Sequence, residues 1–130
     1  MTIERVNPAT LAAPRGFAHA VIGTGTTVFL AGQTALDHTG TIVGTDVVSQ
    51  FEVALNNLLT ALAAAGGRPD QLASLTVYIT DMDDYKRNAA EVGQVWRRLV
   101  GRDYPAMAGI GVSRLWDVEA LVEVAGFAVI

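Results

Sequence analysis

The sequence predicts an α+β fold in which helices pack on one face of a mixed β-sheet. Apolar and polar residues alternate from Leu75 to Thr80, as expected for a strand with one buried face. Apolar residues also recur at helical spacing between residues 47 and 62. The inferred order is three strands, a helix, a strand, a helix and two strands. Helices and strands do not alternate strictly in this order, which favours the α+β class.

We expect one domain spanning residues 1–130, because a chain of 130 residues buries a core but does not hold two domains of usual size. Hydrophobic residues make up 51% of the chain, charged residues make up 17%, and the mean hydropathy is +0.34. A molecule this small does not easily hide so much apolar surface. We therefore expect subunits to associate.

The amino-terminal part predicts three short strands. Residues 3–6 form the first, and Pro8 and Pro14 then bracket a loop in which regular hydrogen bonding is interrupted. Residues 18–22 and 27–31 are rich in β-forming side chains. The Gly-Thr-Gly-Thr sequence between these two strands predicts a hairpin.

The first helix is predicted to begin after Asp46, whose carboxylate suits the N-cap position. Gly66 and Gly67 are expected to end it. Its apolar stripe consists of Val47, Phe51, Ala54, Leu55, Leu58 and Leu62.

A second helix is predicted after the alternating strand. Acidic residues between Asp81 and Asp84 suit its first turn, although clustered carboxylates also bind magnesium. We prefer the capping interpretation, because acidic first turns are common. Two closing strands are expected at residues 106–113 and 119–129. The stripe of this helix consists of Tyr85, Ala89, Val92, Trp96 and Leu99.

Motifs for cofactors and metals are missing or incomplete. The Gly-Thr-Gly sequence at residues 23–25 lacks the third glycine of a dinucleotide fingerprint, and a strand follows it rather than a helix. The chain has no cysteine, which excludes disulfides, thiolate catalysis and cysteine-bound metals. His19 and His38 belong to different elements and have no carboxylate at ligand spacing. We therefore expect no cofactor and no metal.

The charge balance argues against nucleic acid as a partner, because the formal net charge is −4. The densest basic groups, around Arg97 and Lys86, are interpreted as solvated helix faces. Apolar stretches are judged too short to span a membrane, and Glu4 and Arg5 do not fit a signal peptide. We expect a soluble, cytoplasmic protein that binds neither nucleic acid nor a membrane.

Glu123 is the acidic residue that most needs an explanation. It lies in the apolar run Leu-Val-Glu-Val-Ala at residues 121–125. An ionised carboxylate in such a strand is costly unless it faces water, a partner or a ligand. From the residues alone, a solvated position and a ligand-facing position are about equally plausible, since side chains alternate between the faces of a sheet.

Segments along nearly the whole chain match one known family in the right order: residues 29–33, Gln50, residues 56–58, 64–66 and 76–85, Asn88, residues 104–106 and 122–124. Through these segments the chain resembles the YjgF/RidA (Rid) family. The resemblance implies a chorismate-mutase-like fold, with a mixed sheet and two helices on one face, assembled as a homotrimer with a small pocket at each subunit interface. It further implies cofactor-free hydrolysis of enamines and imines such as 2-aminoacrylate.

The resemblance also assigns candidate site residues. Glu123 matches the acid thought to orient or activate the attacking water. Met107 occupies the position of an arginine that grips the substrate carboxylate, and a thioether supplies no charge-assisted hydrogen bond. Phe17 replaces a usual tyrosine and Ala31 a usual polar residue, so the pocket is expected to be less polar than in the family. The remaining candidates for contacts with substrate are Gly32, Gln33, Asn88 and Arg114.

Two alternative functions are therefore considered. In the first, the chain is an enamine or imine deaminase with altered specificity and weak or no activity on 2-aminoacrylate. In the second, it is a noncatalytic trimer that uses the same cleft to bind a small ligand or to regulate a partner.

Overall fold

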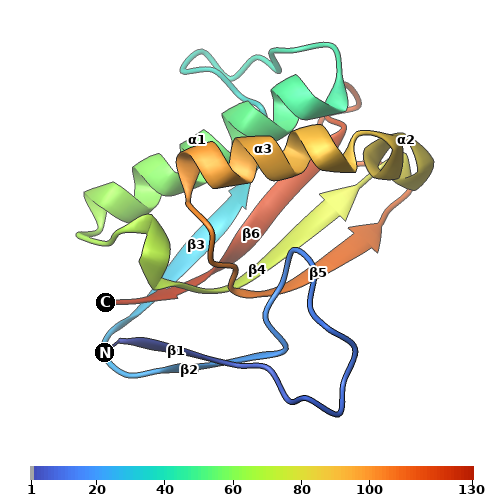
Figure 1. The fold of residues 1–130 in the computed structure, drawn as a ribbon. Coiled ribbons are helices and arrows are strands. Elements are labelled where there is room, and N and C mark those ends of the chain that lie inside the picture. Colours follow the sequence, from blue (N-terminus) through green and yellow to red (C-terminus); the bar gives the residue numbers. More distant parts are fainter. Residues whose placement is uncertain (1) are drawn as a thin grey trace.

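The computed structural model describes residues 2–130 and contains a four-stranded sheet with the order β3-β6-β4-β5. Strand β5 runs parallel to β4, whereas β6 runs antiparallel to both β3 and β4. The sheet is therefore mixed, and Figure 1 shows the helices covering one of its faces. This arrangement confirms the predicted α+β class. The strands are β3 (Thr27–Gln33), β4 (Leu72–Ile79), β5 (Ala106–Gly111) and β6 (Val122–Val129).

Two further strands form a separate small sheet and correct the predicted hairpin. Strand β2 (Ala20–Gly23) pairs with β1 (Ile3–Val6), while β3 pairs with β6. The turn between β2 and β3 explains the divergence. The Thr24 amide donates to the Thr2 carbonyl at 2.8 Å, and the Thr26 amide donates to the Ile130 carbonyl at 2.7 Å. The two sides of the turn are thus bonded to different segments, and the strands do not meet.

The first helix, α1 (Val47–Ala64), agrees with the sequence prediction. Asp46 is its N-cap, and the carboxylate accepts a hydrogen bond from the Ser49 amide at 2.8 Å. At the other end the Gly67 amide donates to the Leu62 carbonyl at 2.9 Å. All six predicted stripe residues are buried, so the helix packs its apolar stripe onto the sheet.

Helix α1 also corrects one expectation about apolar stretches. With 18 residues and a mean hydropathy of 1.2, it reaches the length and composition of a membrane span. Its most apolar face is the one that packs against β3 and β6, where Leu55 and Leu58 are fully buried. Length and composition alone do not distinguish a spanning helix from the core helix of a compact domain, and the packing accounts for these residues as core.

The second predicted helix is divided in two, so three α-helices cover the sheet rather than two. Helix α2 (Met82–Arg87) ends at Asn88, and α3 (Ala89–Leu99) begins directly after it. The Asn88 side-chain amide donates to the Asp84 carbonyl at 2.8 Å, which ends the first segment. A short 3₁₀ turn, η1 (Pro69–Gln71), precedes β4.

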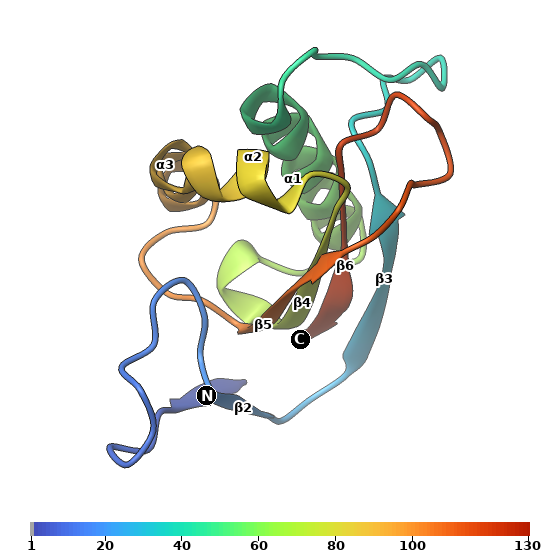
Figure 2. The same cartoon turned by 90° about the vertical axis from the view of Figure 1, so that its right-hand side faces the viewer.

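The two faces of the sheet differ in what covers them. Leu75, Val77 and Ile79 of β4 are buried under the helices, whereas Tyr78 points to the opposite side. Figure 2 shows the helices together on one side of the sheet. We call the opposite side the open face; it carries Tyr78 together with Phe29, Thr76, Ile110, Ala125 and Phe127.

Candidate functional site

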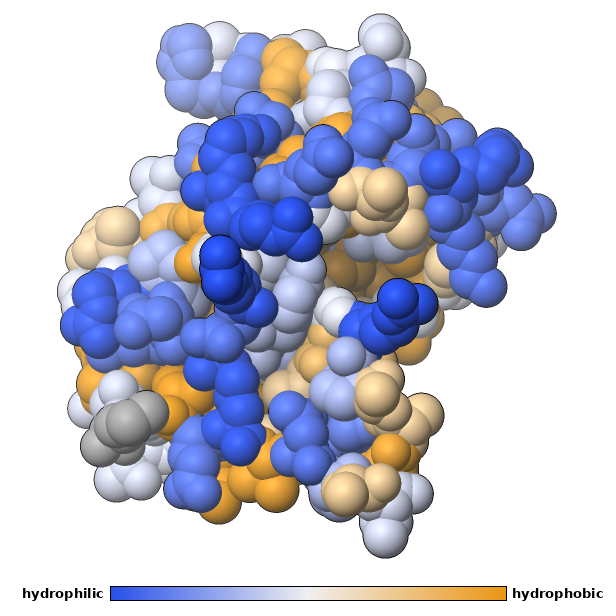
Figure 3. Space-filling model, in the orientation of Figure 1, coloured by the Kyte–Doolittle hydropathy of each residue, from blue (hydrophilic) through white to orange (hydrophobic). Residues whose placement is uncertain are grey.

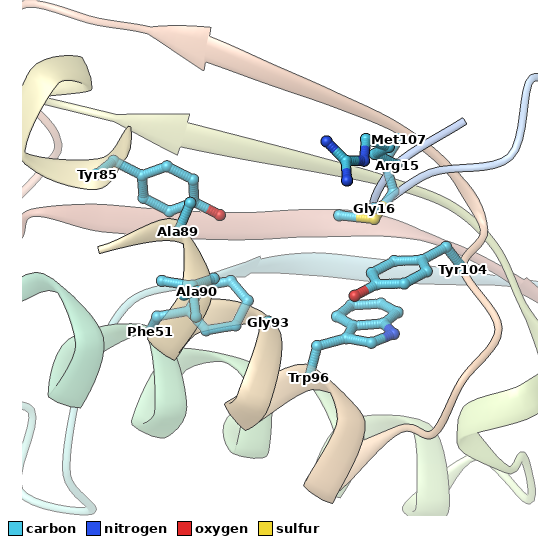
Figure 4. Close-up of a pocket in the computed structure, with 11 residues that line it drawn as sticks. Arg15, Gly16, Phe51, Tyr85, Ala89, Ala90, Gly93, Trp96, Tyr104 and Met107 are labelled. Carbon is cyan, nitrogen blue, oxygen red and sulfur yellow. The ribbon is translucent and has the colours of Figure 1, made fainter. Parts of the chain in front are cut away.

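Met107 faces a large cavity on the helix side of the sheet. It lies opposite Leu75 in the β4–β5 register, and Leu75 is buried under the helices. The cavity has a volume of about 640 Å³ and lies between α3, the edge strand β5 and the N-terminal loop. Figure 4 shows its main lining residues, which are Arg15, Gly16, Phe51, Tyr85, Ala89, Ala90, Gly93, Trp96, Tyr104 and Met107.

Aromatic rings form the walls of this helix-side cavity. Trp96 and Tyr104 stack almost parallel, with ring centroids 5.0 Å apart and an angle of 9° between the planes. The Trp96 indole donates to the Asp103 carbonyl at 3.1 Å, which fixes its orientation. Burial, and to a lesser extent the charge of Tyr104, raises the pKa of Tyr85 to about 12. The Tyr85 hydroxyl is therefore protonated at neutral pH and able to donate a hydrogen bond.

The N-terminal loop brings Arg15 and Phe17 to the same place. Both line a smaller cavity of about 240 Å³ that also contains Met107 and Tyr85. The Ala18 amide donates to the Pro105 carbonyl at 2.9 Å, so the loop is attached next to β5. Gly16, with φ of +74°, supplies a left-handed turn between Arg15 and Phe17 that other residues adopt at a cost. Phe17 and Met107 thus line the same cavity, and their predicted roles in substrate binding stay predictions.

Arg15 is the lining residue that the sequence did not reveal. It is 92 positions away from Met107 in the chain, in a segment with no regular secondary structure. Only the attachment of the loop to β5 brings the two residues to one cavity. The available signal was weak: a single arginine between Pro14 and Gly16.

Glu123 and Gly32 form a second group on the open face. Val122 and Val124 are fully buried on the helix side, so Glu123 between them points the other way, beside Tyr78 in the adjacent strand. A β-carbon built on Gly32 would lie 2.9 Å from the carboxyl carbon of Glu123. Glycine at position 32 therefore leaves the space that the carboxylate occupies.

A bulge in β3 lies next to this carboxylate. The pairing with β6 shifts between Leu30 and Gln33, which leaves Ala31 and Gly32 outside the regular ladder. Ala31 lines an open-face cavity of about 470 Å³ with Phe29, Tyr78 and Phe127. Irregular backbone of this kind exposes amide and carbonyl groups to a ligand. Gln33 is half-buried at the end of the same strand.

Two of the predicted contact residues are occupied by bonds within their own segments. The Asn88 amide group donates to the Asp84 carbonyl and, at 3.3 Å, to the Asp84 carboxylate. Arg114 donates to the carbonyls of Leu115 and Trp116 at 3.1 and 3.2 Å. Neither residue lines the cavity of Met107. Their predicted roles in substrate binding stay predictions.

Within one subunit the predicted site residues are divided between the two faces of the sheet. Met107 and Phe17 lie on the helix side, whereas Glu123, Gly32 and Ala31 lie on the open face. A site that combines the residues of both faces therefore needs a second copy of the chain. In residues 2–130, no three His, Asp or Glu side chains are grouped so that they could hold a metal ion.

Comparison with known proteins shows the family to which the chain belongs. The model of the family described as endoribonuclease L-PSP, which is the YjgF/RidA (Rid) family, matches residues 8–130. The chain belongs to this family. A RutC family protein of Pyrococcus horikoshii is 34% identical to this Rid protein over 108 residues, which is 82% of each chain. The UK114 protein of Drosophila melanogaster, also of the RutC family, is 32% identical over 99 residues, 75% of this chain and 68% of its own.

Solved structures confirm the fold of this Rid protein. A Rid family protein of unknown function from Yersinia pestis, YyfB, superposes with a TM-score of 0.90 at 32% identity over 100% of both chains. TdcF of E. coli with bound serine gives a TM-score of 0.69 at 26% identity over 91% of each chain. The chorismate-mutase-like fold expected from the sequence is therefore correct.

Proposed function

We propose that this Rid protein is a homotrimer that hydrolyses enamines or imines without a cofactor, in pockets at its subunit interfaces, with altered specificity. The observation that carries the proposal is the division of the site between the two faces of one subunit. Glu123 on the open face of one copy and Met107 on the helix side of the next complete a pocket only across an interface.

The open face supports association between copies. Phe29 is 77% exposed and Phe127 is 44% exposed, and their rings contact each other edge to face with centroids 5.3 Å apart. Ile110 on the same face is also largely exposed. Apolar surface of this kind is stabilised when a partner covers it. A second copy that covers this face also brings its own surface to Glu123.

The proposed chemistry assigns Glu123 to the attacking water. Its carboxylate accepts a hydrogen bond from the water and orients the oxygen toward the imine carbon. The carbon–oxygen bond forms as the carbon–nitrogen π electrons move to nitrogen, which takes up protons from water. Cleavage of the carbon–nitrogen bond then releases ammonia and leaves a carbonyl product. The overall balance is one imine and one water consumed for one ketone or ketoacid and one ammonia.

Met107 is the basis for altered specificity. A charge-assisted hydrogen bond contributes about 1.5–3 kcal/mol, and a thioether at this position forms none. A small substrate whose binding depends on its carboxylate therefore loses positioning. Moreover, an alanine-sized molecule leaves most of a cavity of about 640 Å³ unfilled. Weak or no turnover of 2-aminoacrylate follows.

A coupled assay tests this specificity. Serine and a pyridoxal phosphate-dependent dehydratase generate 2-aminoacrylate, and ketoacid release is followed with and without the purified protein. We expect ketoacid release close to the uncatalysed rate. Met107→Arg should increase the rate by about tenfold or more, since the guanidinium then donates the charge-assisted hydrogen bonds that a thioether lacks. Rates equal to those of a Rid protein with arginine at this position, measured in parallel, would refute the altered specificity.

A noncatalytic trimer that binds a small ligand is the second candidate. The TdcF structure with bound serine favours it, because a relative holds an intact amino acid. The two candidates differ in one measurement: a binder shows saturable ligand binding, yet no imine tested is hydrolysed faster than in buffer. Neither candidate requires RNA, and the net charge of −4 makes RNA a less favoured partner despite the family description. We place the protein in the cytoplasm.

A further inference from the structure

Arg15 is a cation without a counterion at the edge of an apolar cavity. Three arginines in the described part of the chain form ion pairs with carboxylates, Arg68, Arg87 and Arg98, and Arg15 is not one of them. No aspartate or glutamate among residues 2–130 lines either cavity that Arg15 borders. In Figure 4 its guanidinium lies at the Met107 end of the larger cavity. The charge is therefore available to an anion that enters there.

Three further arginines lie around Tyr104, which lines the same cavity as Arg15, although the whole chain is acidic. Arg97 and Arg102 line an adjoining cavity of about 330 Å³ that shares Tyr104 with the larger one. Arg5 donates to the Tyr104 carbonyl at 2.8 Å. Figure 3 shows a hollow between the helix layer and the N-terminal loop, bordered by hydrophilic side chains. Grouped charges of one sign raise the local concentration of anions.

Behind this positive edge the cavity is largely apolar. Its walls are aromatic rings and the thioether of Met107, and the hydroxyls of Tyr85 and Tyr104 are polar groups among them. Cavities of roughly 300–1,000 Å³ hold drug-sized molecules, and the volume of about 640 Å³ lies within that range. The shape fits a ligand with one charged end and a bulky apolar body.

We infer that Arg15 is the anion-binding residue of this cavity and that its ligand is a carboxylate with an aromatic or similarly large apolar side chain. The guanidinium fork binds the carboxylate in a bidentate way. The apolar body lies against Met107 and the stacked rings of Trp96 and Tyr104. Arg15 thus supplies, from the N-terminal loop, the charge that β5 does not carry. If the proposed function holds, the substrates are the imines of amino acids with large apolar side chains.

The binding step is tested without turnover. Calorimetric or NMR titration compares 3-phenylpropionate with 3-phenylpropionamide, which has the same body and no charge. Wild-type protein is expected to bind the carboxylate about ten times more tightly or better. Arg15→Gln should remove that preference, whereas Arg15→Lys, which keeps the charge without the fork, should retain part of it.

Arg102→Gln is the matched control, because it removes the same charge from the adjoining cavity and leaves Arg15 in place. We expect it to weaken both carboxylate binding and its salt dependence only slightly. Equal binding of the two compounds by the wild type, or a preference that survives Arg15→Gln, would overturn the inference. An equal loss of the carboxylate preference in Arg102→Gln would also overturn it, since Arg15 would then act only through the electrostatic potential of the grouped arginines.

Turnover separates this inference from the proposed function. An amino-acid oxidase converts phenylalanine to its imine over a range of imine concentrations, and the protein is added in catalytic amount. Accelerated hydrolysis by wild type, with a raised KM and a similar kcat in Arg15→Gln, supports both conclusions. Arginine-dependent binding without acceleration contradicts the deaminase and leaves the inference about the ligand standing. Acceleration that is identical in Arg15→Gln keeps the deaminase and refutes the inference.

Discussion

Position 107 is the residue on which the proposed change of specificity depends. The thioether of Met107 is soft and apolar, and it packs against the hydrophobic core rather than offering donors. Arg15 supplies the inferred positive charge of the cavity instead. Its loop is attached to β5 through the Ala18–Pro105 hydrogen bond. Loops are more mobile than the strands they connect, so the direction of a cation on a loop is less fixed. We expect this cation to accept carboxylates with large bodies, because it borders a cavity of about 640 Å³.

Glu123→Gln tests the acid that the proposed mechanism depends on. The amide keeps the size of the side chain but does not accept a proton, so we expect imine hydrolysis to fall by about 100-fold or more. The elution volume and thermal midpoint should stay unchanged, because glutamine has nearly the same shape and volume as glutamate. Gly32→Ala is a companion variant: its β-carbon would lie 2.9 Å from the carboxyl carbon and displace it. Unchanged rates in both variants would exclude Glu123 from catalysis.

Among the secondary-structure elements, those with a strong internal pattern were predicted best. Helix α1 and strand β4 each bury one face. The apolar residues of that face recur in the sequence at the spacing of a helix or a strand, so both elements could be predicted. The division between α2 and α3 was missed, because the stripe from Tyr85 to Leu99 continues across Asn88 at helical spacing. The side chain of Asn88 decides that break through a local hydrogen bond, which periodicity does not detect.

Leu58→Ala tests the contribution of α1 to stability. Leu58 is fully buried between the helix and the sheet, so its truncation leaves a cavity and should lower the free energy of unfolding by about 2–5 kcal/mol. Urea denaturation at fixed protein concentration measures the change. Thr60→Ala on the exposed side of the same helix serves as the control and should change stability by less than about 0.5 kcal/mol. A similar loss in both variants would contradict the assignment of the apolar stripe to the core.

The arrangement of the whole molecule depends on contacts that are distant in the sequence. Strands β2 and β3 are neighbours in the chain, yet they belong to different sheets because β1 and β6 pair with them instead. No local pattern specifies such partners, which explains why the hairpin prediction was wrong. The same holds for the candidate site: motif resemblance indicated Met107 and Glu123, but only the fold shows that they lie on opposite faces. The excess of apolar residues predicted that subunits associate, and the exposed Phe29 and Phe127 are apolar surface that such association would cover.

Phe29→Asp tests whether copies of the chain associate through the open face. Phe29 contacts Phe127 on a surface that we propose is covered by a second copy, where an unpaired carboxylate would lose its hydration. We expect the protein to change from a trimer to a monomer, as measured by light scattering after size-exclusion chromatography. Asn56→Asp adds the same charge on the exposed side of α1 and should leave the trimer intact. A trimer that persists in Phe29→Asp at micromolar concentration would show that the interface lies elsewhere, and a pocket shared between Glu123 and Met107 would then have no structural basis.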